Sequence, residues 1–592
     1  MTTPDDENSA KLDALNANLV KIEQLTQRLL SAMSQKKAIN PDLEGPSNDL
    51  MMRAAQAYVA EMMSNPARII EHQVGWWGKS LKHYAEAQSR LAKGNLEPPK
   101  DETPADPRFA NPLWESNPFF NFVKQQYLMN AEAVATAVSD MDGMDAGEHK
   151  RVAYFTRQIV EMFSPTNFLS TNPEALARAV ETDGQSLVDG LENLVRDIEA
   201  NNGEMLVTLA DRDAFSVGEN LATAEGSVVY RNRMFELIQY APTTDEVHKT
   251  PLLIFPPWIN KFYIMDLKPQ NSLIRWIVDQ GYTLFVVSWV NPDASYADVG
   301  LEEYMTEGYL EAMAQVKAIC KVKKINVVGY CIAGTTLAMT LALMKARGDD
   351  SVKAVTFFTT LTDFSDQGEF SVFLTDDFVG GIERQVGVDG YLSSHFMART
   401  FSFLRSNDLI FRPAIRSYMM GEAPPAFDLL YWNGDSTNLP AKMAVQYLRQ
   451  LCQADEFARD GITLFDQNLR LSDVDLPLCA IACETDHIAP WRASYTGIRQ
   501  MGSKDKQFIM SQSGHIAGII NPPTKMKYGH YTNDDLSLPP AEWLEGATFH
   551  EGTWWMRWEQ WLRSHAGKKI KARIPGESTN KVLCPAPGTY VK

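Results

Sequence analysis

The chain has 592 residues and a net charge of −18, with 56 basic against 74 acidic side chains. Its length exceeds one ordinary hydrophobic core, so at least two domains are expected. Hydrophobic residues make up 45% and charged residues 22%, as in globular proteins, and the acidic balance argues against general nucleic-acid binding, which needs a basic face.

The N-terminal residues are acidic and polar, so we expect no secretory signal. No apolar run reaches the length of a transmembrane helix. The six cysteines are dispersed and do not form a disulfide framework, which favours a reducing cytoplasm. Cys479 and Cys483 lie on one expected strand, roughly 13 Å apart. A disulfide needs less than about 7 Å, so we expect both to be core residues.

Residues 1–212 are expected to form a mostly helical N-terminal domain without obvious chemistry. Apolar residues at 3-4 spacing over 9–34 indicate either a short coiled-coil seam or a helix packed on its own domain. A helix over 67–91 contains Trp76 and Trp77, which are either surface anchors or core residues. A proline- and charge-rich linker follows at 93–112. Further helices are expected at 51–63, 119–138, 147–163, 173–180 and 185–199.

From about residue 213, strand-like and helical segments alternate, which predicts a mostly parallel sheet covered on both faces. The alternation fails only over about 360–471, a helical, loop-rich and aromatic insertion that we interpret as a lid. The second domain is therefore assigned to 213–592. Its expected strands are 252–254, 283–288, 325–328, 354–359, 478–482 and 507–510, with helices at 273–280, 301–320 and 337–344.

The strand 325–328 runs into Gly329-x-Cys331-x-x-Gly334, and a helix follows. Strand, sharp turn and helix form the context of a nucleophile elbow, which needs small residues beside the nucleophile. Cys331 occupies the position where most elbows carry serine. A buried cysteine at a strand end is also often a small hydrophobic residue, so the assignment depends on its partners.

Two candidate partners follow later strands. Asp486 lies within a turn of the strand 478–482, with Glu484 as the alternative acid nearer the strand. His515 follows the strand 507–510 and is flanked by glycines. The order Cys331, Asp486, His515, each after its own strand, is the nucleophile–acid–histidine order of α/β-hydrolases. The sequence therefore predicts an α/β-hydrolase fold with a lid insertion, preceded by a helical domain.

In this arrangement His515 accepts the proton of the Cys331 thiol, and Asp486 orients the imidazole. A thiolate that attacks a thioester forms another thioester, and the acyl group keeps its transfer potential. This favours acyl transfer from a thioester donor, with a cysteine hydrolase on the same fold as the alternative.

The oxyanion donors are expected to be backbone N–H groups. Ile332 supplies one at the start of the helix after the nucleophile. The second is expected in the loop 256–261 after an early strand. Its two prolines have no N–H, so the donor there should be Trp258 or Ile259.

The chain resembles the polyhydroxyalkanoate synthases of the α/β-hydrolase superfamily from about residue 75 to about 565. The motifs that carry the likeness are specific: Asn111-Pro112-Leu113-Trp114, Pro256 to Leu267 with its Asn-Lys-Phe-Tyr core, Gly281 to Phe285, Ser288 to Pro292, Gly329-Tyr330-Cys331, Asp486 to Trp491, Gly514 to Pro523, and Gly552-Thr553-Trp554-Trp555.

The resemblance implies an acyltransferase that polymerises (R)-3-hydroxyacyl-coenzyme A into a polyester and releases coenzyme A. The family's nucleophile, acid and histidine match Cys331, Asp486 and His515, which favours Asp486 over Glu484. The growing chain is carried as a thioester on the cysteine. The resemblance implies that the aspartate helps to activate the incoming 3-hydroxyl as well as, or instead of, orienting the histidine. No metal or other cofactor is expected, since coenzyme A is a product.

The resemblance also implies a cytoplasmic homodimer at the surface of a polymer granule, with the N-terminal helices and Trp76-Trp77 contacting granule or partner. The long helical N-terminal region is similar to that of the self-sufficient members, which need no second subunit. The motifs most resemble class I, which prefers short-chain monomers such as 3-hydroxybutyryl-coenzyme A. Class II, for medium-chain monomers, is the close alternative.

One departure from the family's Gly-x-Cys-x-Gly-Gly pattern is Ala333, which puts the geometry of the elbow in question. Two competing functions remain. One is a cysteine hydrolase or small-molecule acyltransferase, and the other is a catalytically silent granule-binding protein, against which the intact triad argues.

Overall fold

The computed structural model describes residues 4–34, 56, 106–141, 144–201, 203–578 and 581–592. The chain divides into two compact units. The helical unit comprises Met1–Asp211 together with Thr400–Pro425, and the catalytic unit comprises Arg212–Arg399 with Ala426–Lys592. The expected helices at 51–63 and 67–91, and with them Trp76 and Trp77, lie outside the described residues.

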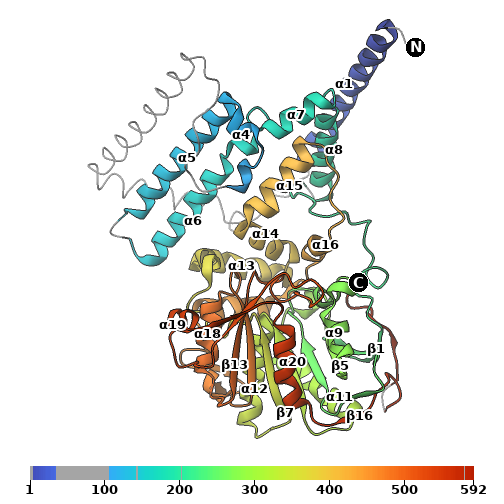
Figure 1. Cartoon of the computed structure of the whole chain (residues 1–592), viewed down its shortest axis with the longest axis vertical. Coiled ribbons are helices and arrows are strands. Elements are labelled where there is room, and N and C mark those ends of the chain that lie inside the picture. Colours follow the sequence, from blue (N-terminus) through green and yellow to red (C-terminus); the bar gives the residue numbers. More distant parts are fainter. Residues whose placement is uncertain (1–3, 35–55, 57–105, 142–143, 202, 579–580) are drawn as a thin grey trace. The chain divides into compact units, whose positions relative to one another are not determined.

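Helices make up the regular structure of the described part of the helical unit (Figure 1). Three of them begin at a side chain that accepts hydrogen bonds from free backbone N–H groups: Asn117, Asp145 and Asn172. The first segment of this unit contains α1 (Pro4–Ser34), α4 (Leu113–Ser116), α5 (Pro118–Ser139), α6 (Ala146–Met162), α7 (Pro173–Glu181) and α8 (Gln185–Ala200), and its second segment contains α15 (Arg412–Ala414).

The second half of α1 packs on α8. Leu25 is buried against Val188 and Val195 of α8, and Leu29 borders the same cluster. Two ion pairs, Lys21 with Glu192 and Arg28 with Glu199, flank these contacts. For this half of α1, the contacts are those of a helix packed on its own domain, one of the two interpretations of the sequence.

A separate aromatic cluster contains Phe109, Trp114 and Tyr127. Trp114 meets the edge of Phe109 with ring centroids 4.9 Å apart. The side chain of Asn121 donates to the carbonyl of Trp114. The Asn-Pro-Leu-Trp motif therefore ends in a buried tryptophan that holds the start of α5.

The part of the insertion that belongs to the helical unit is bound to one face of α8. The face carries Gly190, Asn193 and Asp197, and the absence of a side chain at Gly190 lets the backbone of Tyr418 approach, because a Cβ there would lie 2.7 Å from its carbonyl carbon. Asn193 donates to the carbonyls of Ser417 and Glu422.

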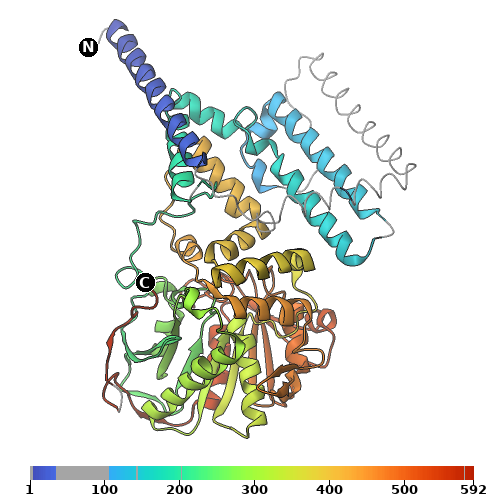
Figure 2. The same ribbon diagram turned by 180° about the vertical axis from the view of Figure 1, so that it is seen from behind.

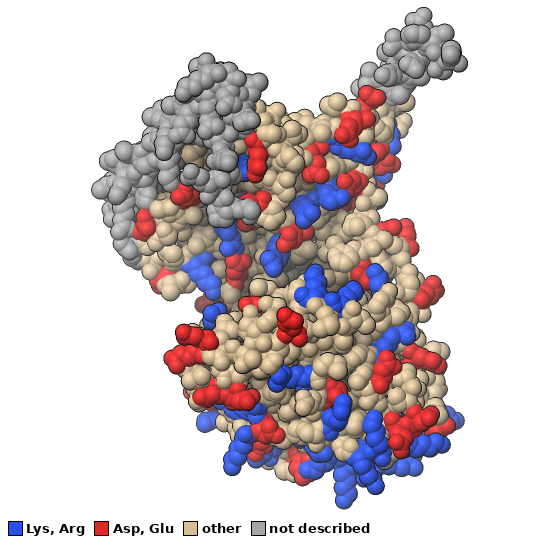
Figure 3. All heavy atoms as spheres, viewed as in Figure 1, with Lys and Arg blue, Asp and Glu red and all other residues tan. Residues whose placement is uncertain are grey.

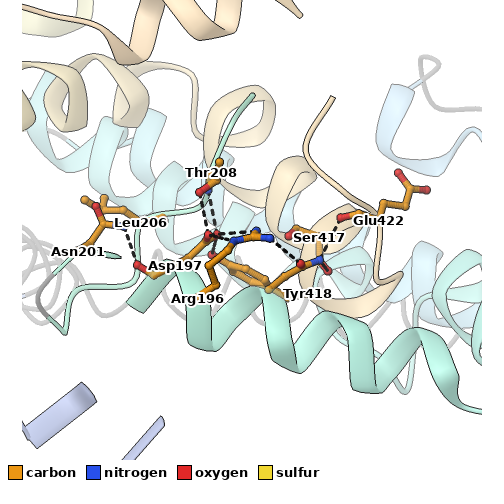
Figure 4. Close-up of polar contacts among 9 residues, drawn as sticks. Arg196, Asp197, Asn201, Leu206, Thr208, Ser417, Tyr418 and Glu422 are labelled. Carbon is orange, nitrogen blue, oxygen red and sulfur yellow. Dashed lines mark hydrogen bonds and ion pairs between the residues drawn. The ribbon is translucent and has the colours of Figure 1, made fainter. Parts of the chain in front are cut away.

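Asp197 is fully buried in this contact, and its carboxylate accepts five hydrogen bonds (Figure 4). Two come from the backbone N–H and hydroxyl of Thr208, at 3.0 and 2.7 Å, and one from the Tyr418 hydroxyl at 2.9 Å. The other two come from the guanidinium of the neighbouring Arg196, each at 3.3 Å. Burial and the nearby carboxylate of Asp197 raise the pKa of Tyr418, so the phenol stays neutral and donates. A buried carboxylate is stable only with such donors.

The catalytic unit is built on an 11-stranded sheet with the order β15-β14-β13-β12-β7-β6-β4-β5-β2-β1-β17. Its strands are β1 (Gly226–Arg231), β2 (Phe235–Tyr240), β4 (Leu252–Phe255), β5 (Leu284–Trp289), β6 (Ile325–Tyr330), β7 (Val352–Phe358), β12 (Leu478–Cys483), β13 (Lys506–Ser511), β14 (His530–Thr532), β15 (Thr548–His550) and β17 (Cys584–Pro585). The small strands β3 (Glu246–His248) and β16 (Lys569–Lys571) pair separately.

The centre of the sheet is parallel, from β13 through β12, β7, β6 and β4 to β5. These are the six strands that the sequence predicts, and they are confirmed within one or two residues at each end. Antiparallel strands extend the sheet at both edges. The sheet is therefore mixed, with its parallel centre carrying the candidate site.

Helices cover the two faces of the sheet. Figure 1 shows α20 (Trp555–Ala566) in front of the strands, where it shares a core with α9 (Leu273–Asp279) and the central strands. The reverse view in Figure 2 has α11 (Glu311–Cys320) and α12 (Ile332–Ala346) in front. Cys479 and Cys483 are free and fully buried in β12, which confirms their assignment as core residues.

The rest of the insertion belongs to the catalytic unit. Its elements include α13 (Asp376–Asp389), α16 (Asp428–Gly434) and α17 (Ala441–Gln446), followed by a π-helical segment at Tyr447–Gln453. Short strand pairs also form here: β8 (Tyr391–Leu392) with β9 (Leu439–Pro440), and β10 (Ile462–Leu464) with β11 (Gln467–Leu469). The helix α14 (Ser394–Leu404) spans the boundary between the two units, and α18 (Trp491–Gln500) and α19 (Pro540–Glu545) follow later in the chain.

Charged side chains of both signs are mixed over the face of the molecule in Figure 3. In the described part of the chain, no helix combines the length and the apolar character needed to span a membrane.

Candidate active site

Cys331 lies alone between the end of β6 and the first residue of α12. Its backbone has φ 55° and ψ −129°, a conformation that costs a non-glycine residue on the order of 1–3 kcal/mol. Backbone hydrogen bonds hold it there: its N–H donates to the carbonyl of Phe358 at 2.8 Å, and its carbonyl accepts from Gly334 at 2.9 Å. This strained turn between strand and helix is a nucleophile elbow.

The elbow depends on two glycines. A Cβ on Gly329 would lie 2.5 Å from the Cα of Gly334, and a Cβ on Gly334 would lie 2.7 Å from Cγ2 of Thr360. Contacts this short do not occur between real side chains, so both positions require glycine for strand and helix to cross closely.

Ala333 does not disturb this turn. It is a buried residue of α12 and does not have a positive φ, and its carbonyl accepts a hydrogen bond from the hydroxyl of Tyr309 at 3.0 Å. The close approach to neighbouring side chains falls on Gly334, the next residue. The departure from the family pattern is therefore compatible with an intact elbow.

Asp486 lies in the turn after β12, and its side chain is fully buried. One carboxylate oxygen accepts the N–H groups of Ile488 and Ala489 at 2.9 and 2.8 Å. The other lies 2.7 Å from Nδ1 of His515. Of the two acids that the sequence left open, the structure brings Asp486, and not Glu484, to the histidine.

His515 follows β13 and is buried beside Asp486 and Cys331. Burial alone would lower the pKa of its imidazole. The negative charges of Asp486 and Cys331, and hydrogen bonds to both side chains, outweigh burial and raise the pKa well above its usual value. The raised pKa makes the His515 imidazole a stronger base for the proton of the neighbouring thiol.

The loop that carries His515 is held by residues whose role the sequence did not reveal. The hydroxyl of Tyr330 lies 3.5 Å from the carbonyl of His515, and the two rings stack with centroids 6.1 Å apart. Trp554 and Trp555 donate their indole N–H groups to the carbonyls of Gly518 and Ile519, each at 2.8 Å. The Gly-Thr-Trp-Trp motif thus holds the loop that carries His515 in place through two hydrogen bonds.

The insertion contributes a residue that sequence analysis did not single out. Tyr447 is buried, its ring meets that of Trp258 edge-on at 5.8 Å, and burial, Cys452 and the charge of Cys331 raise the pKa of its phenol. The phenol therefore stays neutral and is close enough to Cys331 to interact with it electrostatically. A single tyrosine inside a helical pattern gives no sequence signal for such a role.

The loop that follows β4 lies beside the elbow because β4 and β6 are neighbours, with Phe255 opposite Gly329. Trp258 and Ile259 are buried in this loop, and the indole of Trp258 donates to Thr336 of α12 at 3.2 Å. Ile332 opens α12, so its N–H has no partner within the helix. The assignment of these three N–H groups as oxyanion donors stays a prediction.

Among the described residues, no group of three or more histidine, cysteine or acidic side chains is arranged to hold a metal ion. The chemistry that the site offers is nucleophilic: a thiol, a base that can remove its proton, and an acid that fixes the base.

A family model for the alpha/beta hydrolase fold matches residues 250–522, and a model for the N-terminus of poly-beta-hydroxybutyrate polymerase (PhaC) matches residues 105–277. Among solved structures, a soluble variant of monoglyceride lipase from Saccharomyces cerevisiae covers 60% of this chain and 99% of its own, with 12% identity and a TM-score of 0.35. The elbow, the strand order and the first match define an enzyme of the α/β-hydrolase fold.

Curated relatives narrow this class. The poly(3-hydroxyalkanoate) polymerase of Methylorubrum extorquens is 39% identical over 553 residues, which cover 93% of this chain and 91% of the relative. The polymerase subunit PhaC of Cupriavidus necator is 41% identical over 82% of this chain and 83% of its own. The poly(3-hydroxyalkanoate) polymerase 1 of Ectopseudomonas oleovorans is 34% identical over 93% of this chain and 96% of its own. The chain belongs to the poly(3-hydroxyalkanoate) polymerases.

Proposed function

We propose that this enzyme polymerises (R)-3-hydroxyacyl-coenzyme A into polyhydroxyalkanoate, releases coenzyme A, and carries the growing chain as a thioester on Cys331. The observation that carries the proposal is a cysteine, rather than a serine, in the strained elbow beside a histidine whose pKa is raised. Membership of the family supplies the substrate class.

The first half-reaction loads the nucleophile. The thiolate of Cys331 attacks the carbonyl carbon of the substrate thioester, and the carbonyl electron pair moves to the oxygen. Backbone N–H groups of Ile332 and of Trp258 or Ile259 stabilise that charge. The bond to the sulfur of coenzyme A then breaks, and this sulfur takes the proton that His515 holds, which leaves a neutral imidazole.

The second half-reaction forms the ester. The neutral imidazole of His515 accepts the proton of a 3-hydroxyl while the hydroxyl oxygen attacks the thioester on Cys331. A carbon–oxygen bond forms, a carbon–sulfur bond breaks, and the thiolate–imidazolium pair is restored. The elongated chain returns to Cys331 by the same exchange of thioesters.

Two roles for Asp486 are compatible with this scheme: orienting His515, and helping to activate the hydroxyl. Its engagement by two N–H groups and by the imidazole favours orientation. The reaction as written requires no metal or other cofactor, and coenzyme A is only a product.

We further propose class I behaviour with short-chain monomers such as 3-hydroxybutyryl-coenzyme A, with class II and medium-chain monomers as the alternative. The setting would be a cytoplasmic granule surface, with the enzyme as a homodimer. Support for a granule contact comes from large exposed apolar side chains on the helical unit: Phe119, Phe163 and Phe168 are 55%, 62% and 45% exposed. The insertion is proposed to act as the lid.

The test follows free thiol and turbidity together on purified protein, with (R)-3-hydroxyacyl-coenzyme A of four, six and ten carbons. Thiol release with rising turbidity, fastest with four carbons and absent in Cys331→Ala, is the expected result. Thiol release with only soluble hydroxy acid would identify a hydrolase and overturn polymerisation. A preference for ten carbons would overturn the assignment to class I.

A further inference from the structure

A six-residue stretch of the insertion, Trp432–Thr437, lies against the loop after β4 and is called here the clamp. The indole N–H of Trp432 donates to the carbonyl of Lys261 at 2.7 Å. The hydroxyl and the N–H of Thr437 donate to the carbonyls of Trp258 and Ile259 at 2.9 and 3.3 Å. Between these bonds, Asn260 and Ser436 form an isolated antiparallel bridge.

Asp435 fixes the clamp electrostatically. One carboxylate oxygen lies 2.6 Å from the ammonium of Lys261, and the other accepts the hydroxyl of Tyr263 at 2.7 Å. The side chain of Lys261 is only 10% exposed, and Tyr263 is fully buried. Charge-assisted bonds in such a place are short and directional, so they hold the loop in one position.

The clamp binds backbone carbonyl groups of the loop after β4. The direction of these carbonyl groups also determines the direction of the backbone N–H groups that follow them. A peptide unit is planar and trans, so its carbonyl and the following N–H lie on opposite sides of the chain. The hydroxyl of Thr437 fixes the carbonyl of Trp258, and with it the N–H of Ile259 in the same plane. That N–H is therefore directed away from the clamp.

We propose that Thr437 and Asp435 are positioning residues for acylation of Cys331, and that they hold the Ile259 N–H as the second oxyanion donor. This rests on the proposed acyl transfer through Cys331 and deepens it, because it selects Ile259 over Trp258. Neither residue touches the reacting atoms. They act through the loop, and an oxyanion donor that is displaced loses much of its effect.

The test separates oxyanion stabilisation from thiol activation. Acylation by p-nitrophenyl acetate, read as a burst of p-nitrophenol, passes through an oxyanion, whereas alkylation by iodoacetamide needs only the thiolate. Thr437→Val removes the hydroxyl donor at nearly constant volume, and Thr437→Ser keeps it. Thr496→Val, on α18, is a matched control of the same chemistry far along the chain.

Thr437→Val should lower the rate of the burst by about 10- to 100-fold, since removing a whole donor costs about 10²–10³. The rate of alkylation in Thr437→Val should stay within about twofold of the wild-type rate. In Thr437→Ser, at least half of the lost burst rate should be recovered. Asp435→Asn, which keeps the bond to Tyr263 and loses the charge opposite Lys261, should lower the burst rate by about 10-fold. With coenzyme A thioesters, kcat should fall more than KM rises.

A burst rate in Thr437→Val equal to that of the wild-type enzyme would overturn the proposal, as would an equal loss of acylation and alkylation. If Thr437→Val does not fold, the same comparison applies to Asp435→Asn. Wild-type enzyme that reacts with the p-nitrophenyl ester but releases no thiol from hydroxyacyl-coenzyme A would refute the proposed substrate while leaving this inference open to the same test.

Discussion

The contact between Gly334 and Thr360 gives a sharp test of the elbow. In Gly334→Ala, the new Cβ would lie 2.7 Å from Cγ2 and 2.9 Å from Cβ of Thr360, and closer still to its hydroxyl, against 3.4 Å or more for ordinary contacts. Thr360 is buried and bonded to the carbonyl of Phe358, so it cannot easily turn away. The start of α12 or Thr360 must therefore move by about 0.7 Å or more, which costs about 1–3 kcal/mol of stability.

A shift of this size at the nucleophile should lower the acylation rate by about 10²-fold, because catalysis depends on near-ångström placement. The burst with p-nitrophenyl acetate and thermal unfolding measure the two effects. Ala333→Gly, one residue earlier, is the matched control and should acylate at nearly the wild-type rate, with at most about 1 kcal/mol lost for a glycine in a helix.

The double variant Gly334→Ala/Thr360→Ala removes two of the three crowding atoms and should recover part of both losses. If Gly334→Ala acylates as fast as the wild-type enzyme, or if the double variant recovers nothing, then the close crossing of strand and helix does not position Cys331.

Three further predictions concern charge. At pH 6 to 8, alkylation of Cys331 should be faster in the wild-type enzyme than in His515→Gln, because an imidazole whose pKa is raised takes up the proton of the thiol. Equal rates in the two proteins over this range would contradict the pairing. Burial raises the pKa of Asp455 to about 6 from 3.8, so the folded state binds more protons there and stability falls as pH rises from about 4 to about 6. In urea unfolding, Asp455→Asn should thus be no more stable than the wild-type protein at pH 4, and more stable by up to about 3 kcal/mol at pH 7.5. A difference in unfolding free energy between the two proteins that does not change with pH would refute this. Asp197→Ala should destabilise the helical unit by about 3 kcal/mol, since it leaves buried donors unpaired, whereas Tyr418→Phe removes one donor, leaves the carboxylate its bonds to Thr208, and should cost about 1–2 kcal/mol. Hydrogen exchange of the α8 amides measures both effects, and an equal loss of protection in the two variants would count against the buried network.

Local patterns were sufficient to predict the central sheet and the three strand-end residues. Runs such as Leu478–Cys483 are apolar throughout because parallel strands are covered on both faces. The polar residues that follow them stand out against that background, so Cys331 and His515, with Asp486 or Glu484 as the acid, could be proposed from their order along the chain.

The edges of the sheet could not be predicted in the same way. The strands β14, β15 and β17 have two or three residues, too few to show a period. Their positions depend on partners far along the chain: β17 pairs with β1, more than half the chain away.

Tertiary contacts also decide the parts of the insertion that matter most for the site. Asp435 and Thr437 look like ordinary loop residues, and only their meeting with Lys261 and Trp258 gives them a role. The sequence predicts a single insertion over about 360–471, yet Tyr418 and its neighbours attach Thr400–Pro425 to α8.

The division of the chain has a consequence for dissection of the gene. The backbone passes between the two units three times, after residues 211, 399 and 425. A deletion of the first 211 residues therefore does not remove a self-contained module. It leaves Thr400–Pro425 without α8, so Tyr418 loses its buried carboxylate partner, Asp197. If the fragments 1–211 and 212–592 are produced separately, the segment Thr400–Pro425 of the second can bind α8 of the first and so bring the two together. Split-protein complementation is thus a natural way to study this enzyme, and simple truncation is not.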